Sequence, residues 1–314
     1  MRVAVVGLGL IGGSAALALT EAGYEVIGHD VSERAREAAR SRFAVAADPA
    51  ALSGADVAVL AVPMGAIAGS AVDFGPDRFG GIVTDVASVK GRVREAFAGH
   101  RRFVGGHPMA GKAAAGFAEA DPGLFRGRKW ALCLEEDTSL EDWATVAGLW
   151  LSVGAHVVPT THAAHDRAAA LISHVEHLVA AALTLAADDP LSRTLAAGSF
   201  RDATRVASSP VHLTEGMVAS NPDGLLDALD ALGRELDSAR RLVDHHSSEP
   251  RSTEEWLDRA RRLRATWPPE PGGAERLPLT RAGLLALGEA GGWVESIQGI
   301  EVATVRRPRV QSTP

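Results

Sequence analysis

The chain opens with a β-branched run that ends at a glycine-rich turn. Residues 2–6 read RVAVV, and residues 7–12 read GLGLIG, which matches the pattern G-x-G-x-x-G. A helical segment follows, so the pattern predicts a strand, a tight turn and a helix in that order. The first glycine permits the turn, the second lets a pyrophosphate approach the backbone, and the third allows close packing of helix on strand. The residues expected to form this dinucleotide site are Gly7, Gly9, Leu10, Ile11 and Gly12.

A carboxylate follows the next predicted strand, residues 24–28, at Asp30. At this point a carboxylate accepts hydrogen bonds from the adenine-ribose hydroxyls and repels a 2′-phosphate. The sequence therefore favours NAD over NADP, although Arg34 is a nearby side chain that can tolerate the phosphate. The alternatives are a strand-to-helix turn without a nucleotide, and a role for Asp30 as a helix cap. Two residues that follow a further predicted strand complete the expected cofactor contacts, Val62 and Pro63.

Short apolar runs alternate with amphipathic segments over the first 160 residues. This alternation predicts an α/β fold, a Rossmann-type doubly wound parallel sheet with helices on both faces. One helix is expected at 141–152. The remaining strands are expected at 57–61, 81–85, 103–106, 130–134 and 155–159.

The pattern changes near Thr160, after which strand signals vanish and alanine- and leucine-rich helical patterns take over. Their apolar surface exceeds what one small bundle buries, which favours a homodimer. We expect a Rossmann domain at 1–161 and an all-helical dimerisation domain at 162–248. A linker and small C-terminal extension at 249–314 would be either an appended β element or a poorly ordered end.

Composition narrows the class of protein. A formal charge of −7 over 314 residues argues against a chain that coats nucleic acid or an anionic membrane. The opening apolar run is too short for a signal peptide, and no stretch approaches the roughly 20 apolar residues of a membrane helix. The one cysteine, Cys133, fits a reducing compartment. We therefore expect a cytoplasmic protein that binds neither nucleic acid nor membrane.

Two motifs follow predicted strands, at the edge where open parallel sheets bind ligands. TDVASVKG occupies residues 84–91, and GGHPMAG occupies residues 105–111. His107 stands between glycines and a proline, which predicts a rigidly held residue off regular structure. A dehydrogenase that oxidises an alcohol needs a base, and imidazole titrates near neutrality. We expect His107 to be that base and Ser88 to orient it or contact the substrate; the alternative is a loop histidine bonded to backbone.

The helical region offers two further sets of polar side chains. Arg201 and Arg205 lie four residues apart, and an arginine can clamp a carboxylate with two hydrogen bonds. For Arg201 the favoured interpretation is a solvated surface pair with Asp202. Four histidines suggest a metal site as an alternative, but no matched carboxylate–histidine pattern accompanies them, so we expect no metal. These histidines are His162, His165, His174 and His177.

The ordered set of motifs resembles the prephenate/arogenate dehydrogenase family of tyrosine biosynthesis. The resemblance spreads over roughly the first 210 residues and includes both predicted domains. It implies NAD-dependent oxidative decarboxylation of prephenate to 4-hydroxyphenylpyruvate, with hydride moving from C4 to NAD. The matching strings are GLGLIGGS at 7–14, TDVASVKG at 84–91, GHPMAG at 106–111, SHVEHLVAAAL at 173–183 and GSFRDATRVASSP at 198–210.

The resemblance also implies a role for each matching residue. His107 would hydrogen-bond the 4-hydroxyl and act as base, with Ser88 assisting it. Arg205 would grip a carboxylate of this small dicarboxylate substrate. His177 would border the pocket with His174 close by, and the helical domain would form the dimer.

Two departures from the family pattern stand out. Glu176 lies where the family usually has proline, and it could favour the amino group of arogenate over the keto group of prephenate. Alternatively it points away, because in an unkinked helix it lies about 160° from His174 and about 100° from His177. The tail lacks the signature of an amino-acid-binding regulatory domain, so we do not expect tyrosine feedback through such a domain.

Two other classes remain as alternatives. A β-hydroxyacid dehydrogenase or imine reductase would typically show GLGxMG and a lysine on a central helix. Here Ile11 occupies the methionine position, and no lysine follows Thr160. A non-catalytic NAD-binding sensor would not need a rigidly held histidine together with an arginine.

Overall fold

The computed structural model describes residues 1–112, 114–246, 248 and 250–309. The chain divides into two compact units. The first begins at Met1, leaves at His165 and resumes at Pro271, and the second spans Asp166–Glu270. We expected the helical domain to end at residue 248. In the structure the charged helix at 250–265 also belongs to the helical unit, and the tail from Pro271 belongs to the first unit. Residue 249, where that boundary was placed, lies outside the described residues.

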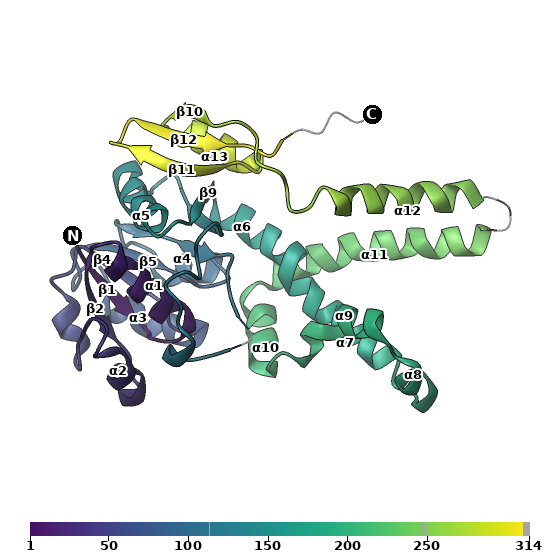
Figure 1. Ribbon diagram of the computed structural model, residues 1–314, viewed down its shortest axis with the longest axis horizontal. Helices are drawn as coiled ribbons and strands as arrows, with labels where there is room; N and C mark the ends of the chain where they lie inside the picture. Colours follow the sequence, from purple (N-terminus) through teal and green to yellow (C-terminus); the bar gives the residue numbers. More distant parts are fainter. Residues whose placement is uncertain (113, 247, 249, 310–314) are drawn as a thin grey trace. The chain divides into compact units, whose positions relative to one another are not determined.

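Six parallel strands form the first sheet, in the order β3-β2-β1-β4-β5-β6 (Figure 1). This strand order is that of the Rossmann fold. Along β1, Val3 and Val5 belong to one hydrophobic cluster while Ala4 and Val6 belong to another. Both faces of the sheet are therefore buried, which confirms the expected doubly wound sheet. The strands are β1 Arg2–Val6, β2 Glu25–His29, β3 Ala44–Val45, β4 Val57–Leu60, β5 Ile82–Asp85 and β6 Phe103–Val104; the helices are α1 Leu10–Glu21, α2 Glu33–Ala39, α3 Ile67–Asp73 and α4 Gly91–Ala96.

The later strands of the first unit form a second, mixed sheet, in the order β10-β12-β11-β9-β8-β7. The chain passes from one sheet to the other at Gly105, so the strand expected at 103–106 is divided between them. Strands β8 and β9 run parallel, whereas β7 and β11 pair antiparallel with their neighbours. The sequence pattern predicted one parallel sheet, because the residue pattern of a buried apolar strand does not depend on which sheet the strand joins. The elements are β7 Gly106–Pro108, β8 Lys129–Cys133, α5 Leu140–Ser152 and β9 His156–Thr160.

The described part of the tail completes this second sheet. Strand β11 pairs with β9 through Val294 and Val157, and β12 lies between β11 and β10. Helix α13 packs on β9 so closely that Gly288 has no room for a methyl group against the carbonyl oxygen of Pro159. The tail is therefore an appended β element rather than a poorly ordered end; residues 310–314 lie outside the described residues. Its elements are β10 Glu275–Pro278, α13 Arg281–Glu289, β11 Trp293–Gln298 and β12 Val302–Arg306.

A cation–π contact joins the tail to β8. The Nζ atom of Lys129 lies 3.0 Å from the centroid of the Trp293 ring, and the His156 ring stacks on the same indole. Burial lowers the pKa of Lys129 to about 8, and the nearby Glu295 opposes that shift. The tail thus covers the half-buried ammonium group of Lys129 with an aromatic ring.

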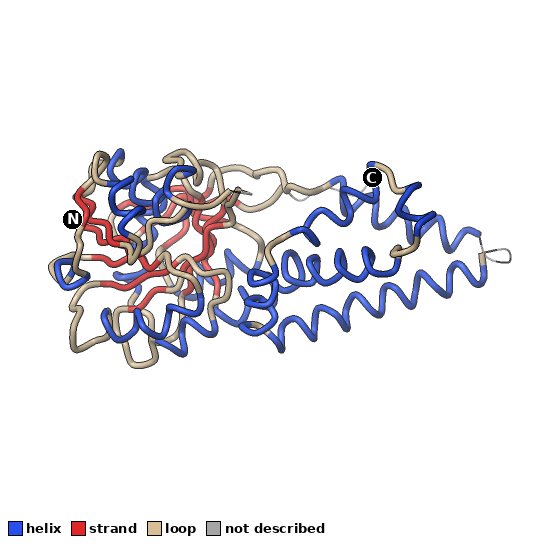
Figure 2. Tube along the Cα trace, turned by 90° about the horizontal axis from the view of Figure 1, so that it is seen from below, coloured by secondary structure: helices blue, strands red, loops and turns tan. Residues whose placement is uncertain are grey.

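The second unit contains only helices and connecting loops among its described residues, which confirms the expected all-helical domain (Figure 2). Helices α11 and α12 lie side by side and are joined through residues 246–249 (Figure 1). Helix α6 begins at His162, before the boundary between the two units at His165 and Asp166, and a π-helical turn at Ala170–His174 follows it. The helices are α6 His162–Ala169, α7 Val175–Ala186, α8 Pro190–Leu195, α9 Gly198–Thr204, α10 Val211–Ser220, α11 Pro222–His245 and α12 Pro250–Ala265.

The continuous helical run His162–Ala186 corrects the expectation that no segment approaches a membrane span. Its 25 residues are long and apolar enough to cross a membrane by length and composition alone. A single such helix is weak support for a span, since core helices of soluble proteins pass the same test. Only 28% of its most apolar window is buried, so much of this apolar surface lies uncovered within one chain.

Candidate functional site

The glycine loop has the geometry of a phosphate cradle. Gly7 has a φ of 92°, and a side chain there would meet the carbonyl oxygen of Ala61. Gly12 packs against the Gly7 carbonyl with no room for a methyl group, whereas a Cβ at Gly9 would meet no atom within 4 Å. Helix α1 starts at Leu10 without a side-chain cap, so its N-terminus suits an anion. The residues present therefore fit the pyrophosphate of a dinucleotide.

Asp30 connects this loop to the end of β2. Its Oδ2 accepts a hydrogen bond from Leu8 N at 2.7 Å, and its Oδ1 accepts one from Ser32 N at 2.8 Å. Arg36, which sequence reasoning did not select, donates to the Asp30 carbonyl oxygen at 2.6 Å. Arg34 is exposed on α2. The Asp30 carboxylate is thus held beside the glycine loop, where a ribose would meet it.

The remaining expected cofactor contacts lie at the same edge of the first sheet. Val62 is half-buried and Pro63 is exposed, and both follow β4, the neighbour of β1. Leu10 and Ile11 form the first turn of α1 and are half-buried. The first unit therefore brings all the expected cofactor residues to the carboxyl ends of β1, β2 and β4, where open parallel sheets bind their ligands.

His107 lies in the short strand β7, opposite Ala131 of β8. This corrects the expectation that it stands off regular structure, although strand pairing does hold it rigidly. Its Nδ1 lies 2.9 Å from Nε2 of His165, and the two rings meet edge to face with centroids 5.1 Å apart. His165 is buried. Sequence reasoning placed His165 only in a metal alternative, because its spacing on the helix gave no sign of a partner 58 residues away.

A buried ion pair fixes the peptide that precedes His107. Asp85 and Lys90 pair with each other at 0% and 1% side-chain exposure. Asp85 Oδ1 accepts a hydrogen bond from Gly106 N at 3.0 Å, and Lys90 Nζ donates to Gly106 O at 2.7 Å. The other Asp85 oxygen accepts from Ala87 N at 2.9 Å, beside the half-buried Ser88. This one ion pair therefore positions both segments that carry Ser88 and His107.

Neither Asp85 nor Lys90 was selected from the sequence, although both stand in TDVASVKG. The sequence feature that could have identified them is an aspartate at the end of an apolar strand and a lysine five residues later. Because an unpaired buried charge is costly, this spacing favours an ion pair between them.

The helical unit contains the other site residues predicted from the sequence. His174 is buried, with its Nδ1 3.5 Å from Nδ2 of Asn221, whereas His177 is half-buried. Arg205 is exposed and begins a 3₁₀ turn that packs against α7, the helix of His177. Glu176 is exposed on α7, which supports the prediction that it points away from the buried His174.

The structure also describes the Arg201–Asp202 pair and the residues considered as metal ligands. Arg201 and Asp202 form an ion pair at 3.5 Å with both side chains exposed, which confirms the expected surface pair. Within the described ranges, no group of three or more histidine, cysteine, aspartate or glutamate side chains is placed to hold a metal ion.

The fold and the site together define the class of protein: an NAD-dependent dehydrogenase with a Rossmann unit and a helical unit. Two family models match successive parts of the chain, the nucleotide-binding domain of prephenate dehydrogenase over residues 15–159 and its dimerization domain over residues 161–258. The chain belongs to the prephenate dehydrogenase family.

Relatives and solved structures agree with this assignment. The chain is 33% identical to the prephenate dehydrogenase of Bacillus subtilis over 79% of its own length and 71% of the relative's. The arogenate dehydrogenase structure from Synechocystis is similar with a TM-score of 0.71 and 32% identity, covering 85% of this chain and 97% of that one. Aquifex aeolicus prephenate dehydrogenase in complex with hydroxyphenyl propionate and NAD⁺ gives a TM-score of 0.76 and 25% identity, covering 84% and 97%.

Replacement of Lys90 by methionine should destabilise the protein strongly, because it leaves the buried Asp85 charge without its partner. We expect the free energy of unfolding to fall by about 3–5 kcal/mol, measured by urea denaturation. Lys112→Met is the matched control, since it removes the exposed ion pair with Asp121 and should change stability little. Equal effects of the two substitutions would contradict the role given to the buried pair.

Proposed function

We propose that the protein catalyses the NAD-dependent oxidative decarboxylation of prephenate to 4-hydroxyphenylpyruvate in tyrosine biosynthesis. The observation that carries this proposal is His107, hydrogen-bonded to His165 in the unit that also holds the dinucleotide cradle. Membership of the prephenate dehydrogenase family supplies the substrate class. When bound, NAD supplies the hydride acceptor for C4 of the substrate.

The histidine pair suits His107 to the work of a general base. In the tautomer in which His107 Nδ1–H donates to His165 Nε2, the other ring nitrogen of His107 carries the lone pair. That nitrogen can take the proton of the 4-hydroxyl as the C4 hydride leaves. The ring carboxylate then departs as carbon dioxide, its bonding electrons make the ring aromatic, and the resulting phenolate oxygen takes the proton back from His107. His165 is thus a positioning residue that fixes the tautomer of the base.

The remaining selected residues bind and orient the substrate in this proposal. Ser88, held beside the Asp85–Lys90 pair, assists His107 at the hydroxyl. Arg205 grips a substrate carboxylate with its guanidinium, for which its exposed side chain is available. His177 borders the substrate, with the buried His174 three residues earlier in the chain close by. Orientation of C4 is the main task, because aromatisation by decarboxylation is strongly downhill.

Arogenate is the second candidate substrate. The similarity to the Synechocystis arogenate dehydrogenase favours it, as does the carboxylate of Glu176 if it reaches the substrate's amino group. The two family models and the Bacillus subtilis relative, which are all described as prephenate dehydrogenase, favour prephenate instead.

A direct assay decides between these substrates. The protein is mixed with NAD and either prephenate or arogenate, and absorbance of the reduced cofactor is followed. We expect a higher kcat/KM for prephenate, and the same preference in Glu176→Gln. A preference that changes in this variant would give Glu176 a role in specificity, and no turnover with either substrate would overturn the proposed function.

Removal of the base should affect chemistry rather than cofactor binding. His107→Asn should lower kcat by about 10²–10⁴-fold, because general-base catalysis contributes on that scale. NAD affinity, measured by fluorescence titration, should stay unchanged. Loss of NAD affinity in this variant would instead indicate that His107 has a structural role.

The helical unit further supports a homodimer in the cytoplasm. Many of the exposed large apolar side chains lie on this unit, including Leu185, Leu195, Val211 and Val243 at 70–81% exposure. Large exposed apolar surface marks interaction sites, and the matching family model is a dimerization domain. The lone cysteine fits a reducing compartment.

Sedimentation equilibrium should give twice the mass of one 32.7 kDa chain. A monomer at micromolar concentration would contradict the proposed dimer. Val211→Glu together with Val243→Glu should shift the equilibrium toward monomer, because buried unpaired charge opposes association. The matched control is Val72→Glu on the first unit, where the side chain is 61% exposed.

A further inference from the structure

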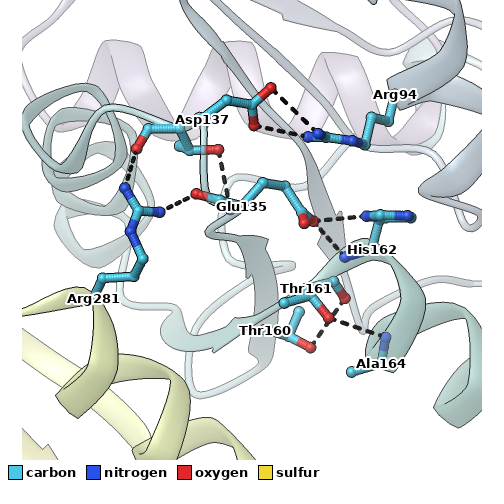
Figure 3. Close-up of polar contacts among 9 residues, drawn as sticks. Arg94, Glu135, Asp137, Thr160, Thr161, His162, Ala164 and Arg281 are labelled. Atoms are coloured by element: carbon cyan, nitrogen blue, oxygen red, sulfur yellow. Dashed lines mark hydrogen bonds and ion pairs between the residues drawn. The ribbon is translucent and has the colours of Figure 1, made fainter.

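We propose that Arg281, in the C-terminal tail, is a positioning residue for the catalytic histidine pair. It acts through a turn at residues 135–138 and through Glu135, which holds the start of the helix that carries His165 (Figure 3). This inference rests on the proposed function, since it assigns a remote contributor to the same site. Every contact in the series lies within the first unit.

The first contact joins the tail to the turn. Arg281 lies at the start of α13 and donates through Nη1 to the carbonyl oxygen of Glu135 and through Nη2 to that of Thr138, the latter at 2.7 Å. The turn is also closed within itself, because Thr138 N donates to Glu135 O and Glu135 N donates to Thr138 Oγ1. A planar guanidinium can reach both carbonyls at once, which the single ammonium of lysine does less well.

The second contact joins the turn to helix α6. Glu135 Oε1 accepts hydrogen bonds from His162 N at 2.6 Å and His162 Nδ1 at 2.9 Å, and its side chain is only 12% exposed. Thr161 Oγ1 accepts from Ala164 N in the same first turn. A carboxylate at a helix N-terminus satisfies an orphan donor and interacts favourably with the helix dipole. Glu135 therefore fixes where α6 begins.

The third contact reaches the catalytic strand. His165 lies in the first turn of α6, with its backbone N–H bonded to the Thr161 carbonyl, and its ring meets His107 at 2.9 Å. A shift of the helix start would therefore move His165 relative to His107. Displacements of about 1 Å at a catalytic group can cost about 100-fold in rate.

Arg281 lies beyond the segments that define the family. The second of the two family models ends at residue 258, whereas Arg281 belongs to the tail that adds strands to the second sheet. The tail thus contributes more than extra strands, because its arginine holds the turn whose Glu135 contacts the start of α6 (Figure 3). The same turn carries a separate ion pair between Asp137 and Arg94 at 3.1 Å, which does not involve the Glu135 or Thr138 carbonyls.

Kinetics of the full-length protein provide the first test. Arg281→Ala should lower kcat by about 10–100-fold while the KM for NAD stays within twofold. Arg281→Lys should recover part of the loss. Glu135→Ala should act similarly, and the double variant should be no worse than the more severe single variant, because both act through one contact series. Arg94→Ala is the matched control, because Arg94 contacts the same turn from helix α4 through Asp137, and it should leave kcat unchanged.

Hydrogen exchange provides a second test that does not depend on activity. In Arg281→Ala, the amide of His162 and its neighbours in the first turn of α6 should exchange at least tenfold faster than in the wild type. The tail control Arg307→Ala, which removes only the exposed contact with Glu275, should leave this exchange unchanged. Unchanged exchange and unchanged kcat in Arg281→Ala would overturn the inference. Failure of the wild type to turn over prephenate or arogenate would overturn the proposed function, while the exchange result would still decide the positioning role.

Discussion

The Asp85–Lys90 ion pair is the interaction on which the rest of the site depends. The two opposite charges at and just after the carboxyl end of β5 are almost fully buried. The Gly106 N–H donates to Asp85, and the Gly106 carbonyl oxygen accepts from Lys90. Such a pair is costly to bury and more costly to break, so it holds the peptide in one place. His107 follows Gly106 directly. The position of His107, the proposed base, is thereby tied to the first sheet, although its own strand β7 belongs to the second sheet.

His107, the proposed base, is supported from two directions. The ion pair fixes the chain before His107, and the His165 ring contacts the His107 imidazole. His165 lies on helix α6, whose first N–H, that of His162, is bonded to Glu135. These supports come from different parts of the sequence, and the tail joins the second of them through Arg281. A general base needs a fixed tautomer and orientation, and rigid elements around it supply both more reliably than a free loop does.

Local patterns predicted the local parts of this structure. The glycine loop and the strand at 2–6 were predicted because their physics is contained in a few neighbouring residues, and Asp30 was predicted from its place after the next strand. The second sheet was not predicted, since apolar strands do not specify their partners. Contacts such as Gly106 with Asp85, 21 residues apart, and Arg281 with Glu135, 146 residues apart, depend on the folded chain. His165 was noticed only as one histidine among four, because its partner could not be inferred from spacing on a helix.

The return of the tail to the first unit has a consequence for how the chain is made. Strand β9 acquires its neighbour β11 only after the whole helical unit has left the ribosome, since Pro271 follows Glu270 of that unit. Until then β9 is an open edge with unpaired backbone groups, the kind of surface that associates with other chains. Because domains fold in order of synthesis, the unit that begins first is among the last to be completed.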